Sequence, residues 1–126
     1  MKRLAMLASS LVLVLSASSA MAGAEAMAAA GKKVFEHHCD ACHSDDSSKN
    51  TFGPNLVGVY GRKAGSLPRF AYSDAIKKSG LTWDEETLRK WIADNDGLVP
   101  GTRMRHVAIT DRAEQDYLIA FLKSMK

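Results

Sequence analysis

Hydrophobic side chains recur at helical spacing in several parts of the chain and predict helices separated by long irregular segments. One helix is expected over Glu25–His38, with Ala30, Val34 and Phe35 on one side. A C-terminal helix is expected from Thr110 or Asp111 onward. Its apolar positions recur every four residues, at Ala113, Tyr117, Phe121 and Met125. Leu118 and Leu122 widen this apolar side. Alternation of period two is not sustained anywhere, so the expected fold class is all-α with about four helices.

Two shorter helices are expected between these. Ser73–Lys78 is the first, ended by Gly80. The second follows Thr82-x-x-Glu85, which has the pattern of a capping box, and ends at Asn95-Asp96-Gly97. The segments Asp45–Pro68 and Val99–Ile109 are rich in turn-forming residues and predict loops. Loops this long in a small all-α domain indicate that something central holds them.

The N-terminus has the pattern of a secretory signal peptide. A basic start at Met1–Arg3 precedes the apolar run Leu4–Leu15, and Ala20-Met21-Ala22 provides small residues around a cleavage point. The apolar run is shorter than the roughly 20 residues that a bilayer span needs. Cleavage is expected after Ala22, with Ala24 or Ala26 as alternatives.

Removal of residues 1–22 leaves residues 23–126, which is enough for one small domain. A domain of this size has a thin core, so a large buried cofactor would replace part of it. Loss of Lys2 and Arg3 reduces the 17 basic residues to 15, against 14 acidic ones. The basic isoelectric point of the full chain is therefore no argument for nucleic-acid binding, and no basic stripe with interleaved aromatics is present.

The sequence Cys39-Asp40-Ala41-Cys42-His43 is the strongest chemical signal in the chain. Two thiols at C-x-x-C spacing followed by histidine form the attachment signal for one haem c, bound through two thioethers, with His43 beside the iron. A redox disulfide would require a βαβ context, which is not visible. A zinc site would require a second ligand pair, and His37 and His38 are too close in sequence to provide it. Covalent haem is therefore predicted.

A second iron ligand would decide between electron transfer and small-molecule binding. The candidates are Met104, Met125 and His106. Met125 lies on the apolar side of the last predicted helix and is interpreted as core. Met104 lies in the polar loop Pro100–Met104, where it has no evident packing role. A thioether ligand favours reduced iron and raises the potential.

Seven short motifs, in order, resemble class I cytochrome c, the group that contains mitochondrial cytochrome c and its bacterial periplasmic relatives. The resemblance extends from about Gly31 to Lys123. The motifs are Gly31-Lys32-Lys33-Val34-Phe35 with the Cys39–His43 sequence, Gly53-Pro54-Asn55-Leu56, Gly61-Arg62-Lys63, Tyr72-Ser73-Asp74-Ala75, Leu81-Thr82-Trp83, Pro100-Gly101-Thr102-Arg103-Met104 and Leu118-Ile119-Ala120-Phe121-Leu122.

The resemblance implies a role for individual residues. His43 would be the proximal and Met104 the distal ligand, and the Pro54 carbonyl would accept the His43 Nδ1 proton. The haem propionates would be bound by the side chains of Arg62, Tyr72 and Trp83 and by the Thr102 hydroxyl. Gly31 and Phe35 would meet Leu118 and Phe121 where the terminal helices cross.

Three positions depart from the mitochondrial pattern. Ile76 and Trp91 stand where Asn and Tyr are usual, so the cavity wall beside Met104 is expected to be drier, which would raise the potential. His106 stands where a phenylalanine usually covers the haem edge. It is interpreted either as a surface histidine or as a residue that leaves that edge wetter.

The resulting hypothesis is a monomeric periplasmic electron carrier with one haem, not an enzyme. It would serve a respiratory or photosynthetic chain by transient contact of its haem edge with membrane-bound or periplasmic redox proteins. Nucleic-acid binding and stable membrane insertion are not expected. One alternative is an electron-transfer subunit of a larger dehydrogenase or oxidase. Another is a haem peroxidase or gas sensor, which would require Met104 to be labile or not a ligand.

Overall fold

The computed structural model describes residues 5–105 and 108–126, and this part of the chain is all-α. It contains five helices and no β-strand, although Lys63 and Thr82 form an isolated antiparallel bridge. The all-α prediction is confirmed, with one helix more than expected. The helices are α1 (Ala5–His38), α2 (Asp74–Lys78), α3 (Glu85–Ala93), α4 (Asn95–Leu98) and α5 (Arg112–Ser124).

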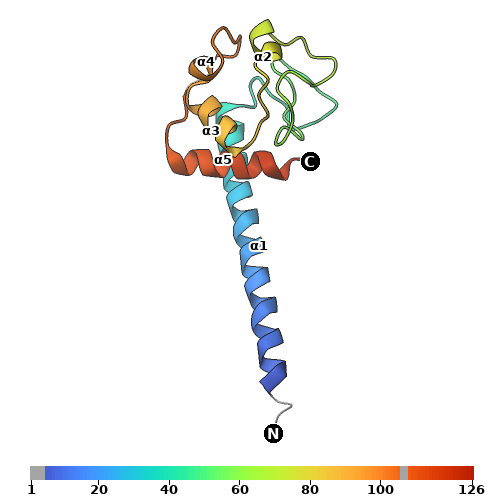
Figure 1. Cartoon of the computed structure of the whole chain (residues 1–126), viewed down its shortest axis with the longest axis vertical. Coiled ribbons are helices and arrows are strands. Elements are labelled where there is room, and N and C mark those ends of the chain that lie inside the picture. Colours follow the sequence, from blue (N-terminus) through green and yellow to red (C-terminus); the bar gives the residue numbers. More distant parts are fainter. Residues whose placement is uncertain (1–4, 106–107) are drawn as a thin grey trace.

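The two terminal helices cross, and a glycine permits their close approach. In Figure 1, α5 lies across α1 near the point where α1 enters the folded part of the chain. A Cβ atom on Gly31 would lie 1.8 Å from the Tyr117 carbonyl oxygen and 2.8 Å from the Phe121 Cβ. The rings of Phe35 and Phe121 pack beside this crossing with their centroids 5.4 Å apart. The expected crossing is present, with the Tyr117 backbone as the nearest part of α5.

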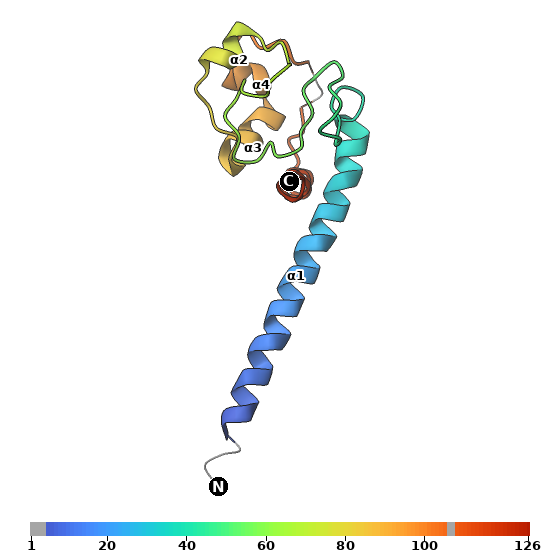
Figure 2. The same ribbon diagram turned by 90° about the vertical axis from the view of Figure 1, so that its right-hand side faces the viewer.

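The first helix begins much earlier than the predicted Glu25. It runs without interruption from Ala5, because the alanine-rich segment favours a helix and contains no proline. Figure 2 shows its N-terminal part projecting away from the other helices. Residues 19–27 are all exposed, and close contact with α5 is made at Gly31. In the described part of the chain, no helix is both long and apolar enough to cross a membrane.

Helix α3 starts with a capping box, two residues later than predicted. The Thr87 backbone N–H donates to the Asp84 carboxylate at 2.8 Å, and the Asp84 backbone N–H donates to the Thr87 hydroxyl at 2.9 Å. Thr82 is not the cap; its carbonyl accepts the Thr87 hydroxyl at 2.6 Å. The predicted pair was wrong because Asp84 is also a strong N-cap residue. The Thr87 hydroxyl can accept the N-cap backbone N–H, as a Glu side chain would.

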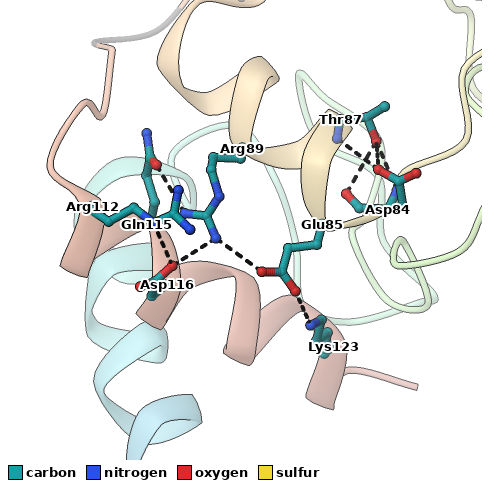
Figure 3. A network of polar contacts seen from close by, with 8 residues as sticks. All are labelled: Asp84, Glu85, Thr87, Arg89, Arg112, Gln115, Asp116 and Lys123. Atoms are coloured by element: carbon teal, nitrogen blue, oxygen red, sulfur yellow. Dashed lines mark hydrogen bonds and ion pairs between the residues drawn. The ribbon is translucent and has the colours of Figure 1, made fainter.

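Polar side chains join α3 to α5 (Figure 3). Arg89 contacts the Gln115 side-chain oxygen at 3.1 Å and the Asp116 carboxylate at 2.8 Å. Glu85 accepts a hydrogen bond from the Lys123 ammonium at 2.7 Å. The apolar sides of both helices are thereby left to face the interior.

Helix α4 occupies the segment that was predicted to be a break. Asp94 ends α3 and at the same time caps α4, because its carboxylate accepts the Gly97 backbone N–H at 2.9 Å. The residues Asn95, Asp96 and Gly97 therefore interrupt the longer helix but form a short turn of their own. The predicted loops, Asp45–Pro68 and Val99–Ile109, contain no helix among the described residues.

The buried side of α5 agrees only in part with the one predicted. Leu118, Phe121 and Leu122 are buried as expected. Ile119 is buried as well, whereas Ala113 and Tyr117 are exposed. The backbone of Tyr117 is the part that meets α1, and its ring faces outward. Met125 is partly buried against the core, as interpreted from the sequence.

Candidate functional site

A cavity of about 560 Å³ lies between the long loops, α3 and α5. Most of its wall is apolar, and every predicted site residue lies on it. The apolar lining includes Leu56, Val59, Ile76, Leu88, Ile92, Leu118 and Leu122. The predicted site residues on the wall are Cys39, Cys42, His43, Pro54, Arg62, Tyr72, Trp83, Thr102 and Met104.

The two cysteines follow directly on the end of α1. Turn-like hydrogen bonds continue the helix direction, with the Cys42 and His43 backbone N–H groups donating to the Cys39 carbonyl at 3.0 and 2.8 Å. Both thiols are free; Cys39 is partly buried and Cys42 exposed. Burial raises the pKa of the Cys39 thiol to about 11, with smaller contributions from Asp40 and Cys42. Before any covalent attachment this thiol is therefore protonated at neutral pH.

His43 is buried and held in one orientation. Its Nδ1 donates to the Pro54 carbonyl oxygen at 2.8 Å. A carbonyl can only accept, so Nδ1 carries the proton and Nε2 keeps the lone pair that a metal would use. Gly53 lies against the ring: a Cβ there would be 2.4 Å from His43 Cε1 and 2.6 Å from Nδ1. The backbone N–H of Gly53 also donates to the Cys42 carbonyl at 2.7 Å.

Met104 lies on the cavity in a segment without regular structure. Thr102, only 3% exposed, is beside it, and the Met104 backbone N–H approaches the Thr102 hydroxyl at 3.4 Å. The Met104 carbonyl accepts a hydrogen bond from the Asn95 side-chain amide at 2.8 Å. Farther along the chain, the Ile109 backbone N–H donates to the Ile92 carbonyl at 2.9 Å. Long-range contacts therefore hold this segment.

A half-buried cation faces the cavity next to two further donors. Arg62 donates to the carbonyls of Val57 and Asn55 at 3.1 and 3.2 Å. Desolvation lowers the pKa of its guanidinium, and no carboxylate of the described residues offsets this. Burial likewise raises the pKa of Tyr72. Trp83 adjoins Arg62 through a backbone hydrogen bond of 2.9 Å.

This arrangement fits haem. Haem is a largely apolar group with two carboxylates, so it needs an apolar cavity and a cation or donors for those carboxylates. The cavity wall provides the first, and Arg62 with its neighbours provides the second. Cys39 and Cys42 lie on the same wall, at the spacing that attachment requires.

Two of the three positions that depart from the mitochondrial pattern can be placed in the structure. Ile76 and Trp91 both lie on the cavity wall, and Ile76 is 6% exposed. The Trp91 ring packs against Trp83 with centroids 5.1 Å apart, so this wall is built from apolar groups. His106, the third departure and a candidate ligand, lies outside the described residues.

Two contributors to the site were not predicted. Gly53 was part of a motif, yet its contact with the His43 ring was not foreseen; its position directly before Pro54 was the available signal. Asn95 was interpreted as a helix breaker. Its contact with Met104 spans nine positions and carries no local signal in the sequence.

Comparisons with known proteins agree with this geometry. The family model described as cytochrome c matches residues 28–126. The chain is 52% identical to cytochrome c2 iso-2 of Magnetospirillum fulvum over 87 residues, covering 69% of this chain and 91% of that protein. It is 45% identical to cytochrome c2 of Blastochloris viridis over 111 residues, covering 87% and 86% respectively.

A solved structure is similar as well. Cytochrome cH from Methylobacterium extorquens superposes with a TM-score of 0.72 at 50% identity, covering 77% of this chain and 97% of that one. The fold, the cavity and the haem-binding motif formed by Cys39 and Cys42 all agree with these similarities. The chain belongs to the cytochrome c family and is a mono-haem electron carrier similar to bacterial cytochrome c2.

Proposed function

We propose that this carrier works in the periplasm and that His43 and Met104 are the two axial ligands of its haem iron. The observation that carries the proposal is the placement of both side chains on one apolar cavity, with the His43 Nδ1 bonded to the Pro54 carbonyl so that the ring lone pair is on Nε2. Haem c supplies a one-electron ferric–ferrous couple when bound. Two retained ligands leave no open position for a substrate.

The remaining site residues have distinct roles in this proposal. Pro54 orients His43 and, by accepting its proton, makes the ring a stronger donor. The Met104 thioether favours the reduced state. Donors from Arg62, Tyr72, Trp83 and Thr102 bind the propionates. The pairing of Arg62 with an anion is supported by its half-buried guanidinium, for which the described residues supply no carboxylate partner.

Residues 1–22 are proposed to be a cleaved signal peptide and residues 23–126 the mature domain. The basic and apolar pattern at the N-terminus supports export. The projection of the first part of α1 away from the domain is compatible with its removal, because residues 19–27 are exposed. The similarity to bacterial cytochrome c2 supports the same location.

The partners are proposed to be membrane-bound or periplasmic redox proteins that contact the monomer transiently. The cavity reaches the surface beside Cys42, which is exposed, and Phe52, which is 91% exposed. A small apolar patch of this kind suits a weak, short-lived interface. A tight subunit of a larger oxidase or dehydrogenase would instead co-purify with its complex.

Replacement of the proposed distal ligand tests the proposal. Met104→Ala should give a high-spin or water-ligated ferric form, lower the potential and remove the far-red band of methionine-ligated haem. Met125→Ala is the matched control, since Met125 lies at the end of α5 and should leave the band in place. Survival of the band and potential in Met104→Ala would refute the assignment. A high-spin wild type would instead favour the peroxidase or sensor alternative.

A further inference from the structure

A buried side chain from α4 contacts the backbone of the segment that carries Met104. Asn95 is 9% exposed, and its Nδ2 donates to the Met104 carbonyl oxygen at 2.8 Å. We infer that Asn95 is a positioning residue that keeps the Met104 segment closed over the cavity, and that its loss opens the distal side of the haem to other ligands. This inference rests on the proposed role of Met104 as a ligand.

Asn95 lies at the junction of α3 and α4, where hydrogen bonds hold the backbone. Asn95 is the first residue of α4, directly after Asp94, which links α3 to α4. The Asp94 backbone N–H donates to the Lys90 carbonyl at 2.9 Å, and the Val99 backbone N–H donates to the Asn95 carbonyl at the same distance. Because α3 lines the cavity through Trp91 and Ile92, Asn95 connects the cavity wall to the Met104 segment.

Apart from the buried Thr102 hydroxyl, which belongs to the segment itself, the other side chains that contact its described residues are exposed. Arg105 donates to the carbonyls of Met104 and Thr102 at 3.1 and 2.9 Å, and Arg103 reaches the Ala71 carbonyl. Both arginines are exposed, so water replaces their hydrogen bonds at little cost when the segment moves. The buried Asn95 amide has no such replacement. Its bond therefore contributes most to the difference between the closed and open positions.

Opening can be measured with an added ligand. Imidazole binds the ferric iron only when methionine has left, so its apparent affinity follows the population of the open state. Loss of one buried hydrogen bond should raise that population about tenfold. Imidazole should therefore bind Asn95→Leu holoprotein about tenfold more tightly than wild type. Asn95→Asp keeps the shape, replaces the donor by an acceptor and should act in the same direction.

Gln115 offers a matched control. It is 5% exposed, and its Nε2 donates to the Ile109 carbonyl at 2.8 Å, which is the same kind of bond near the other end of the same stretch of chain. Gln115→Leu removes this bond and also the one that Gln115 accepts from Arg89, so it should lower global stability at least as much but leave imidazole affinity near the wild-type value. Denaturant unfolding of each holoprotein gives the global effect, and imidazole titration of the ferric form gives the local one.

The outcomes separate the two claims. Tighter imidazole binding in both Asn95 variants but not in Gln115→Leu supports the inference. Unchanged binding in the Asn95 variants, or an equal gain in Gln115→Leu, overturns it while leaving methionine ligation intact. Absence of the far-red methionine band from the wild type overturns the ligation proposal, and the inference about Asn95 with it.

Discussion

The two sides of the cavity that carry His43 and Met104 are built in different ways. His43 follows a helix and two cysteines, and neighbours within eleven positions along the chain hold it: the Pro54 carbonyl at 2.8 Å and Gly53 against the ring. Met104 lies in an irregular segment. Asn95, nine positions earlier in α4, binds its carbonyl, and contacts from Arg103 to Ala71 and from Ile109 to Ile92 tie the segment to more distant parts of the chain. The His43 side is set by one short stretch of sequence, whereas the Met104 side also needs contacts between distant elements.

The difference affects how firmly the carrier holds its haem and how readily the Met104 ligand can be exchanged. A locally built side forms as soon as its own segment folds, which suits the residues that must hold haem during attachment. A side held by separate hydrogen bonds can open without unfolding the rest, because each bond contributes only a modest free energy. Stability toward ligand exchange is therefore expected to depend on the Met104 side.

The largest effect is expected on the His43 side. In Gly53→Val, the new side chain would overlap the His43 ring, since even a Cβ would lie 2.4 Å from Cε1. The ring must move away from the iron and from Pro54, so holoprotein should be lost or strongly reduced. Absorbance of covalent haem per protein in periplasmic extracts measures this outcome.

Gly58 provides the control for that prediction. It has a φ of +67° but no atom within 4 Å of an added Cβ. Gly58→Val should therefore cost only backbone strain, about 1–2 kcal/mol, and should still carry haem. If both variants lose haem equally, the contact between Gly53 and His43 is not the cause and the comparison of the two sides is weakened.

The same contrast decides how much could be predicted from sequence. The attachment motif and the position of His43 follow from five consecutive residues, and the helices follow from periodicity. The role of Pro54 and the roles of Met104, Arg62 and Thr102 came from resemblance to a family, because contacts between separate loops leave no local pattern. Asn95 was missed because its local propensity indicates a break, whereas its contact with the Met104 carbonyl, nine positions later, gives it a buried partner.

Errors in the fold predictions have a similar origin. The capping box was assigned to Thr82 and Glu85, although Asp84 and Thr87 satisfy the same donors. In α5 a four-residue repeat selected Tyr117, a residue that is 38% exposed. The close approach of Gly31 to its backbone turns that position outward. In both cases several residues met the local rule, and packing decided among them.

An intermediate effect is expected from the apolar wall between the two sides. Ile76→Asn introduces a polar group at a position only 6% exposed and on the cavity. The amide should admit water beside Met104 and stabilise the extra charge of ferric iron, so the potential should fall. Stability should also fall, by about 1–3 kcal/mol, from burial of a polar group.

Ile119→Asn separates these two consequences. Ile119 is 2% exposed but belongs to the core rather than to the cavity wall. Its replacement should destabilise the protein at least as much and leave the potential nearly unchanged, as measured by redox titration and denaturant unfolding. An equal fall in potential in both variants would show that loosening of the fold, not polarity of the wall, controls the iron.

The smallest effect is expected far from both sides, in the polar network between α3 and α5 (Figure 3). A hydrogen bond from Lys123 is the largest cause that lowers the pKa of Glu85 below its ordinary value. A lowered carboxyl pKa stabilises the fold above the ordinary value, and this contribution is lost as pH falls through the lowered one. Because the pair is exposed, it should be weak and screened by salt. Glu85→Gln should therefore lower Tm slightly at pH 7 and low salt, and this difference from wild type should vanish in strong acid or high salt. Neither the potential nor imidazole affinity should change. A shift in imidazole affinity would show that the outer network restrains the Met104 side, which the separate tethering of that segment by Asn95 argues against.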